Sequence, residues 1–286
     1  MLHDKNQKLF KYGEDKWVTY GEMVEALKSV DADQCEVLLI HTDLSFGLPD
    51  RTLKRQELMG ILYDCFRELK IKTMVFPTFT FSYGNHEDFD VRNSKSKMGM
   101  LNEYVRKRED SVRSLDPLMS VCVVGEKKEL AEVSGDKSLG KGSFFDRLHK
   151  EENVRILFFG AQLGQCHTHM HYVEEKLRVP YRYDKEFEGN IIDYEGNAKP
   201  DKHILYVKYR DVLPSVPPTF EEELIREGLF KKVSVGNSTI SCFTEKVAYE
   251  KAVEWLSRDI NCFLEEPYDT KPLVKEYRYG NVTTVQ

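Results

Sequence analysis

The sequence GAQLGQCHTHMHYVEEKLRVPY, residues 160–181, decides how the middle of this chain folds. The apolar run VRILFF, residues 154–159, comes directly before it and ends at Gly160. A short apolar run bounded by glycine predicts a buried strand. The next residues, 168–177, predict a short helix that stops before Pro180, because the residue before a proline avoids the helical region. We therefore expect a strand, a loop that contains glycine, and the start of a helix.

Histidines and carboxylates crowd this predicted helix. His171 lies three residues before Glu174 and four before Glu175, and both spacings place the side chains on one helix face. A carboxylate beside a histidine holds the ring in one tautomer and stabilises its charged form. Such a pair suits a general base that takes a proton from an amine or from water. A surface pair with no chemical task has the same spacing, so the pattern by itself leaves both interpretations open.

Two other chemistries compete for the same stretch. The first is a metal site formed by four of its side chains, His167, His169, His171 and Glu174. This spacing lacks the clear ligand pairs of mononuclear zinc signatures. The second is a thiol nucleophile, Cys166 beside His167, that would form an acyl-enzyme. Adjacent side chains often point in different directions, so we expect neither a metal nor a covalent intermediate.

Composition narrows the class of protein. The chain has 286 residues, of which 41% are hydrophobic, so it can bury a core as one large domain or two small ones. A formal net charge of -6 argues against a nucleic-acid partner. The six cysteines lie far apart and form no CxxC pair, which excludes zinc ribbons and thioredoxin-like motifs. We expect reduced thiols in a cytoplasmic protein.

Neither the first residues nor any apolar run suggests a signal peptide or a membrane span. Residues 1–8 are polar and lack the apolar core of a signal peptide. No apolar run approaches the ~20 residues that a membrane span requires. Residues 267–286 are polar and predict a loose end. We therefore expect small-molecule substrates and no membrane span, while the sequence does not set the oligomeric state.

The order of strands and helices predicts an α/β fold. Residues 35–41 and 73–76 predict strands, and residues 51–70 between them carry apolar residues at helical spacing. This alternation indicates a central mixed β-sheet with parallel neighbours, flanked by helices. We expect residues 1–180 to form the main catalytic portion that binds acyl-coenzyme A. Residues 181–286 are expected to form a smaller, β-rich portion that completes the fold.

Other segments predict the surroundings of that sheet. In residues 78–97 the periodic pattern breaks down among aromatic residues, which indicates a long active-site loop. Residues 190–209 predict a hairpin outside the main sheet, because strand-like runs flank a turn signal. Residues 220–228 and 244–259 predict helices, and residues 231–241 predict a last hairpin.

Five segments resemble, in this order, the motifs of the aminoglycoside 3-N-acetyltransferase family. They are HTDLSFG at 41–47, VFPTFT at 75–80, FD with SKMG at 89–99, RSLDPLMS at 113–120 and THMHYVE at 168–174. The likeness extends over most of the chain, and five motifs in register are more specific than any one of them. One position departs from the pattern: Asp116 stands where the family usually has histidine.

The resemblance implies a reaction. Members of this family transfer an acyl group from coenzyme A to an amine on a sugar. Some act on aminoglycosides, and relatives of the same fold acylate nucleotide-linked amino sugars that build surface glycans. The resemblance makes His171 the general base and Glu174 its orienting partner. We expect direct attack on acyl-coenzyme A, which carries either an acetyl or a longer acyl group, without a metal.

The resemblance also implies binding residues, and each of them equally suits a turn or a cap. Four are expected to bind coenzyme A: Ser45, Thr78, Arg113 and Ser114. Three are expected to contact the acceptor: Thr80, Asp90 and Asp116. The chain has no GxxxxGK[ST] sequence, so the phosphates of coenzyme A would be held by scattered donors.

The charge of residues 78–97 bears on the acceptor. This segment contains both acidic and basic side chains: Glu87, Asp88, Asp90, Arg92, Lys95 and Lys97. A mixed charge suits an acceptor that carries an amine and a diphosphate. We therefore favour a nucleotide-linked amino sugar for surface-glycan biosynthesis. The alternatives are an aminoglycoside 3-N-acetyltransferase that confers antibiotic resistance, and a binding protein of the same fold that has no activity.

Overall fold

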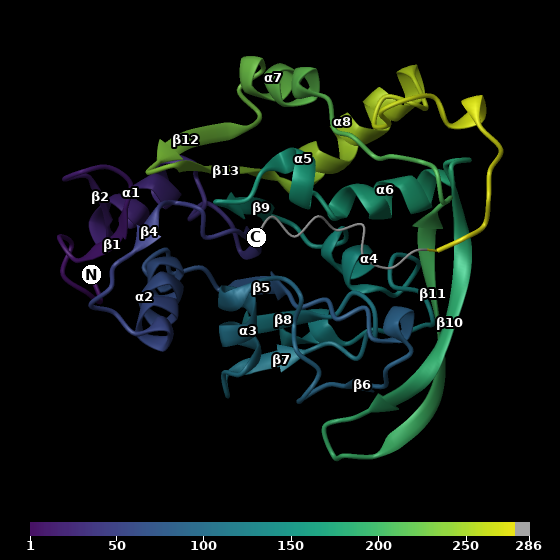
Figure 1. Ribbon diagram of the computed structural model, residues 1–286, viewed down its shortest axis with the longest axis horizontal. Helices are drawn as coiled ribbons and strands as arrows, with labels where there is room; N and C mark the ends of the chain where they lie inside the picture. The colour runs from purple at the N-terminus through teal and green to yellow at the C-terminus, as the bar shows by residue number, and fades with distance from the viewer. Residues whose placement is uncertain (278–286) are drawn as a thin grey trace.

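The centre of the molecule is a seven-stranded mixed sheet, shown in a computed structural model that describes residues 1–277 (Figure 1). Its strands follow the order β12-β13-β9-β3-β5-β8-β7. In the middle, β3 (Val37–Thr42) pairs in parallel with β5 (Thr73–Pro77) and with β9 (Val154–Phe159). Helix α2 (Arg55–Arg67) connects β3 to β5. The predicted α/β class and its parallel neighbours are confirmed.

Antiparallel strands extend the sheet on both sides. On one side β8 (Val121–Gly125) pairs with β5, and β7 (Ser111–Arg113) pairs with β8. On the other side β13 (Ser238–Thr244) pairs with β9, and β12 (Lys231–Val235) pairs with β13. This last hairpin was predicted, and it belongs to the main sheet. The main sheet therefore takes strands from both of the portions expected from the sequence, and their division at residue 180 stays a prediction.

Helices cover both faces of the sheet, so its central strands are apolar throughout. Along β3, Val37 and Leu39 face one apolar cluster. Leu38 and Ile40 face the other, because successive side chains of a strand point to opposite faces. Helices α1 (Tyr20–Ser29) and α2 pack on the second face, and α6 (His169–Leu177) and α8 (Glu245–Arg258) pack on the first. A strand buried on both faces has no polar alternation.

Capping explains where one of these helices begins. Helix α1 starts after Thr19, whose side chain accepts a hydrogen bond from the backbone N–H of Glu22 in a capping box. Helix α6 starts differently. Thr168 already has helical dihedral angles, φ -66° and ψ -24°, and its side chain makes no capping hydrogen bond. A threonine directly before a helix often caps it through its side chain, and Thr168 does not.

The remaining helices are short and connect strands. They are α3 (Met100–Arg106), α4 (Phe144–Leu148), α5 (Leu163–Cys166) and α7 (Pro218–Arg226), with 3-10 turns η1 (Tyr83–Asn85), η2 (Lys128–Ala131) and η3 (Tyr268–Thr270). Of the loose end predicted for residues 267–286, residues 267–277 contain only the turn η3 and otherwise no helix or strand, and residues 278–286 lie outside the described part of the chain. None of the helices in residues 1–277 is long and apolar enough to cross a membrane.

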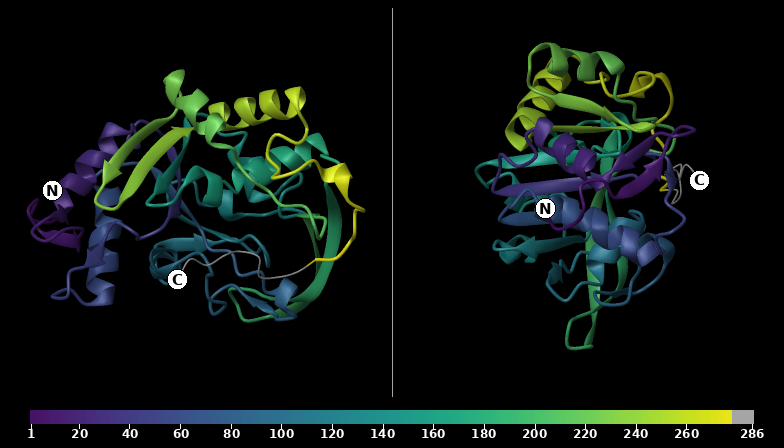
Figure 2. Two further views of the ribbon diagram at one scale, coloured as in Figure 1. Left: turned by 45° about the horizontal axis from the view of Figure 1, so that its top comes forward. Right: turned by 90° about the vertical axis from the view of Figure 1, so that its left-hand side faces the viewer.

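A long hairpin lies outside the main sheet, as predicted. Strands β10 (Arg182–Ile192) and β11 (Ala198–Lys208) pair over their full length, and β6 (Phe89–Asp90) adds in parallel to β10. Figures 1 and 2 show this hairpin along one side of the molecule. A third sheet, near the N-terminus, joins β1 (Lys8–Lys11) to β2 (Trp17–Thr19) and β4 (Leu48–Pro49).

Residues 78–97 are mostly irregular, but three of their aromatic side chains are buried and Phe81 is half-buried. Phe79, Tyr83 and Phe89 each expose 2% or less of their surface. Tyr83 packs against Gly189 of β10 so closely that an added Cβ would lie 2.5 Å from its ring. The segment predicted as an active-site loop is therefore anchored to the core and to the hairpin.

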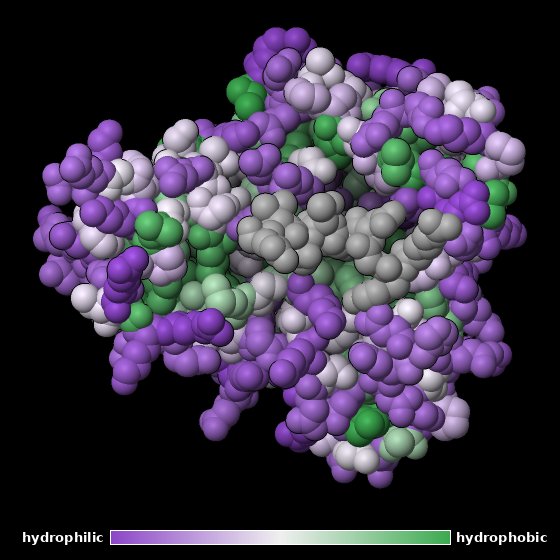
Figure 3. All heavy atoms as spheres, viewed as in Figure 1, coloured by the Kyte–Doolittle hydropathy of each residue, from purple (hydrophilic) through white to green (hydrophobic). Residues whose placement is uncertain are grey.

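The face shown in Figure 3 is mostly hydrophilic, and its apolar residues gather in small patches. All six cysteines are free, and three of them, Cys65, Cys122 and Cys242, are buried. The three buried thiols pack as small apolar side chains, and the reduced state of the cysteines stays a prediction.

Candidate active site on helix α6 and strand β10

Helix α6 brings its histidine and glutamate into contact. His171 Nδ1 lies 2.9 Å from Glu174 Oε2, as the three-residue spacing predicts. Glu174 is buried, and the hydroxyl of Tyr181 donates to its other oxygen over 3.0 Å. The His171 side chain keeps 35% of its surface exposed. When Nδ1 donates to Glu174, the other ring nitrogen, Nε2, is free to accept a proton.

Arg182, the first residue of β10, completes this cluster, and the sequence did not point to it. Its Nε lies 2.8 Å from Glu174 Oε2 in an ion pair, although the N–H is not aligned as a hydrogen bond. Its Nη2 lies 2.9 Å from His171 Nδ1, and Nη1 donates to the carbonyl of Tyr206 over 3.2 Å. The side chain is nearly buried. No periodic pattern marks this position, because the contact depends on how β10 returns to α6.

The charges of this cluster set the protonation of its members. Burial lowers the pKa of His171, and the positive charge of Arg182 lowers it further, while Glu174 opposes both. Burial alone would raise the pKa of Glu174, but Arg182, His171 and Tyr181 together hold it below its ordinary value. At neutral pH the cluster therefore contains a carboxylate and a neutral imidazole, which is the form that a general base requires.

The other histidines of the stretch turn away from this pair. His169 Nε2 lies 2.7 Å from Glu245 Oε1, at the start of α8, and that oxygen also contacts His149. His167 is buried and its ring stacks with that of His169, with centroids 6.0 Å apart. Within residues 1–277 no group of three or more histidine, cysteine or acidic side chains is arranged to hold a metal ion. His167 and His169 therefore contact groups other than His171 and Glu174, so the four side chains do not converge as the metal-site alternative requires.

Cys166, the alternative nucleophile, is half-buried at the end of α5. Burial raises the pKa of its thiol, and the nearby carboxylate of Asp43 raises it further. A raised pKa leaves little of the reactive thiolate at neutral pH. The surroundings of Cys166 thus favour an inert thiol.

Three of the four residues expected to bind coenzyme A are buried in the fold. Arg113 donates to four oxygens, those of Ser120 Oγ and the carbonyls of Thr78, Val91 and Ser94, over 2.6 to 3.2 Å. Thr78 and Ser114 are also buried, and Ser114 Oγ accepts from the backbone N–H of Val121. These bonds tie residues 78–97 to β7 and β8. Contact of the three with coenzyme A stays a prediction, which this geometry does not favour.

Ser45 differs, because it is exposed in the loop after β3. This loop lies against the loop after β9, where a Cβ on Gly160 would come within 1.9 Å of the Asp43 carbonyl. Gly160 has a φ of +74°, which disfavours other residues as well. The two loops thus meet where the parallel strands β3 and β9 end.

The residues expected to contact the acceptor also have partners in the fold. Asp90 accepts from the backbone N–H groups of Arg92 and Asn93, which makes it a turn residue. Thr80 donates to the carbonyl of Pro117 over 2.9 Å. Within residues 1–277 no hydrogen bond or ion pair connects them directly to His171 or Glu174. Their contact with an acceptor remains a prediction.

Asp116 forms a buried ion pair that the sequence did not predict. Its Oδ1 accepts from the backbone N–H groups of Leu118 and Met119 and lies 3.6 Å from His203 Nε2, on β11. Burial opposes both charges, but Asp116 and Asp201 raise the pKa of His203, and His203 in turn helps to lower that of Asp116. The family usually has a histidine at position 116; here the imidazole at this place belongs to His203 of β11, and residue 116 is its carboxylate partner.

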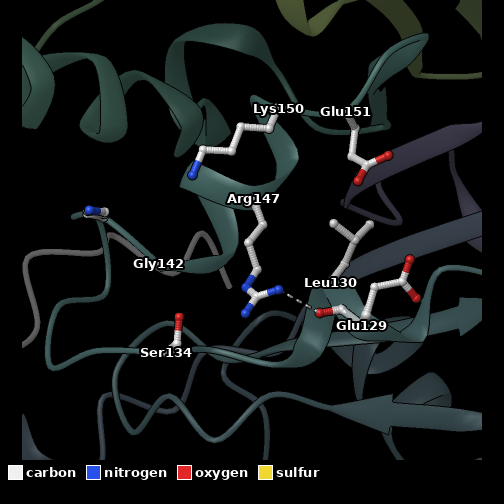
Figure 4. A pocket seen from close by; sticks show the side chains of 8 residues that line it. Glu129, Leu130, Ser134, Gly142, Arg147, Lys150 and Glu151 are labelled. Carbon is white, nitrogen blue, oxygen red and sulfur yellow. Dashed lines mark hydrogen bonds between the residues drawn. The ribbon is translucent and has the colours of Figure 1, made fainter.

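A hollow of about 510 Å³ lies between η2, residues 134–142 and α4 (Figure 4). It is lined by Glu129, Leu130, Ser134, Lys141, Gly142, Arg147, Lys150 and Glu151. Arg147 forms no ion pair within residues 1–277, its Nε is buried without a partner, and Nη1 makes one long bond to the Glu129 carbonyl. Through Asp146, which contacts both Lys150 and Lys176, the hollow adjoins helix α6.

Comparison with known sequences gives one family. A family model described as aminoglycoside 3-N-acetyltransferase matches residues 72–257, which is well over half of the chain and includes α6 and β10. No protein with a curated description matches the chain.

Solved structures share the fold. The YokD protein from Bacillus subtilis superposes with a TM-score of 0.68 at 17% identity, covering 85% of this chain and 95% of that one. AAC-IIIb in binary complex with CoASH gives 0.67 at 17% identity, with 87% and 98% covered. AAC-VIa bound to sisomicin gives 0.69 at 16% identity, with 85% and 98% covered. At such identities the likeness establishes the fold alone.

Proposed function

We propose the function of this chain from one premise: the chain belongs to the aminoglycoside 3-N-acetyltransferase family. The family consists of acetyltransferases that use coenzyme A, and the predicted class of enzyme is confirmed. The reaction that the site supports best is direct transfer of an acyl group from acyl-coenzyme A to an amine of a sugar. One observation carries this proposal: a partly exposed His171 held by the buried carboxylate of Glu174 at 2.9 Å.

His171 does the proton chemistry of this reaction. It accepts the proton that the amine must lose as its nitrogen bonds to the acyl carbon of the thioester. Glu174 stabilises the imidazolium that results. As the carbon–sulfur bond breaks, the imidazolium returns the proton to the departing sulfur. One carbon–nitrogen bond forms and one carbon–sulfur bond breaks, so the enzyme needs no covalent intermediate.

For the acceptor we propose an aminoglycoside-type sugar with several amines. The family description names such acceptors, and the similar structures include AAC-VIa bound to sisomicin and an AAC(3)-IVa mutant in complex with a gentamicin. The aminoglycoside-type acceptor replaces the nucleotide-linked amino sugar that the mixed charge of residues 78–97 favoured. That charge says less about the acceptor in the folded protein, because two of the three carboxylates in the segment already have partners: Asp88 accepts from Asn190, and Asp90 holds a turn.

A nucleotide-linked amino sugar remains the second candidate, for one reason. Lys95 and Lys97 are exposed and form no ion pair with any residue from 1 to 277. Cations without a carboxylate partner suit the diphosphate of such an acceptor better than they suit a polycation.

We assign the phosphate end of coenzyme A to the hollow of Figure 4. Arg147 and Lys141 contribute positive charges without an ion-pair partner among residues 1–277, and Ser134 adds a hydroxyl. Two carboxylates also line the hollow: Glu151 is neutralised by Lys127, whereas Glu129 forms no ion pair within residues 1–277 and opposes an anion there. A phosphate is held best by such charge-assisted hydrogen bonds. Asp146 of α4, the residue before Arg147, contacts Tyr172 and Lys176 of α6, the helix that also carries His171.

The test is release of free thiol from acetyl-coenzyme A, with a panel of amine acceptors, by the native enzyme and by His171→Asn. We expect turnover with at least one amino sugar and a loss of ~10²-fold or more in the variant, the usual scale for a general base. Because His171 is partly exposed, the variant should keep its melting temperature. His3→Asn, which changes a histidine near the N-terminus, is the control. Near-normal turnover in His171→Asn would refute the assignment, and no turnover with any acceptor would favour the binding-protein alternative.

A further inference from the structure

The Nδ1 atom of His171 has two neighbours that cannot both bond to it in the same way. Glu174 Oε2 and Arg182 Nη2 each lie 2.9 Å from this nitrogen. A carboxylate only accepts hydrogen bonds and a guanidinium only donates them. With a hydrogen on Nδ1 the ring bonds to Glu174, and Nε2 is the free acceptor. Without that hydrogen the ring accepts from Arg182, and Nε2 carries the proton.

Arg182 is fixed in this position by the fold. Only 8% of its surface is exposed, and its Nη1 bonds to the Tyr206 carbonyl at 3.2 Å. Tyr206 is in turn fixed by its own hydroxyl, which donates to the carbonyl of Val179. The positive charge therefore cannot move away from His171 without losing the hydrogen bond to Tyr206 and the ion pair with Glu174.

We propose that Arg182 is a positioning residue of the reaction, which neutralises Glu174 and offers His171 a second hydrogen-bond partner, so that the ring rests as a neutral mixture of two tautomers. This inference rests on the proposed function. In the tautomer bonded to Glu174, Nε2 takes the proton of the amine. The imidazolium that forms faces a nearby guanidinium, so it is driven to pass the proton on to the departing sulfur.

The titratable groups around His171 come from three segments. Glu174 lies on the same helix and Arg182 on β10, and both are charged. His167, in the preceding loop, has a neutral ring. Lys208, opposite Arg182 on β11, directs its amine to the carbonyls of Arg210 and Val212. Arg182 is therefore the cation whose removal should change His171 most.

The test is nitrogen NMR of the His171 ring, assigned with His171→Gln, across a pH titration. In the native enzyme we expect a neutral ring at pH 7 with both tautomers populated. In Arg182→Gln we expect the ring to titrate ~1 pH unit higher, because a nearby like charge has been removed. The acid limb of kcat/KM should move up by the same amount. Arg182→Lys should restore the native titration but not the native tautomer mixture.

Arg178→Gln is the matched control, because Arg178 is an exposed arginine at the end of the same helix and pairs with Asp184 instead. It should change neither the titration nor the pH profile. A single tautomer or an imidazolium in the native enzyme at pH 7 would overturn the proposal, and this measurement does not depend on any variant folding. So would an unchanged titration in a folded Arg182→Gln. Failure of acyl transfer would instead refute the function, since the NMR result does not require turnover.

Discussion

At the residue scale, burial acts in opposite ways on the two candidate reactive groups. Burial lowers the pKa of the His171 imidazole and raises that of the Cys166 thiol, so both groups are neutral at neutral pH. Neutral imidazole is the active form of a base, whereas a neutral thiol is the inactive form of a nucleophile. The same physical effect thus favours direct attack over an acyl-enzyme.

This contrast predicts the behaviour of Cys166→Ala. The variant should keep native turnover, because the thiol is not ionised and takes no part in the reaction. Mass spectrometry of the native enzyme mixed with acyl-coenzyme A should show no stable acyl adduct. An adduct located on Cys166, together with an inactive variant, would establish the two-step route instead.

The Asp116–His203 pair predicts a pH-dependent stability. The raised pKa of His203 gives stability that is present below its ordinary value of 6.5 and is lost as the pH rises through the folded value. The lowered pKa of Asp116 gives stability that is present above its ordinary value of 3.8 and is lost as the pH falls through the folded value. The pair therefore contributes most between these limits.

His203→Gln should lower the free energy of unfolding by about 3 kcal/mol near pH 6, since it leaves a buried carboxylate unpaired. The difference from the native protein should shrink as the pH rises above the folded pKa of His203. Urea unfolding at several pH values measures this difference. A difference that stays constant with pH would show that the imidazole is not charged in the folded protein.

At the scale of elements, short segments around the sheet carry the proposed site. Helix α6 contributes the proposed base His171 and its partner Glu174, and β10 returns to this helix with Arg182. Helix α4 contributes Asp146, which contacts Lys150 on one side and Lys176 of α6 on the other. Helix α4, which lines the hollow, therefore contacts α6, the helix of the proposed base.

This arrangement predicts the effect of Arg147→Gln. The KM for acyl-coenzyme A should rise about tenfold, the scale of one charge-assisted hydrogen bond, while kcat changes little. Removing the 3′-phosphate from the substrate tests which phosphate is held, because the variant and native enzymes should then differ less if that group is the partner. Arg51→Gln, at an exposed arginine outside the hollow, should leave KM unchanged. An unchanged KM in Arg147→Gln would move the phosphate site elsewhere.

At the scale of the whole molecule, charge bears on the choice of acceptor. A formal net charge of -6 gives a polycationic acceptor a weak general attraction that salt reduces. The kcat/KM for kanamycin or gentamicin should therefore exceed that for a UDP- or dTDP-linked amino sugar by tenfold or more, which corresponds to about 1.4 kcal/mol of transition-state preference. It should also fall as salt is added. The opposite order, with affinity lost in Lys95→Gln and Lys97→Gln, would establish the nucleotide-linked acceptor.

Local sequence determined the elements and the first pair of the site. The apolar run before Gly160, the helical spacing of His171 and Glu174, and the turn between β10 and β11 all depend on neighbours a few residues apart. Periodicity records which face of a strand or helix is buried, so the order of residues is enough to predict these features. The chain's five motifs, taken together, were enough to predict its family.

The tertiary structure alone decided which distant residues meet. Arg182 reaches His171 because β10 turns back on α6, and His203 reaches Asp116 because β11 crosses the loop after β7. Arg113, which is expected to bind coenzyme A, is enclosed by carbonyls of residues 78–97, a contact that its position in the sequence did not indicate. The last hairpin joins the main sheet beside β9. Such contacts depend on how whole helices and strands pack together. The spacing of residues along the chain predicts only which face of one element is buried, so it does not predict these contacts.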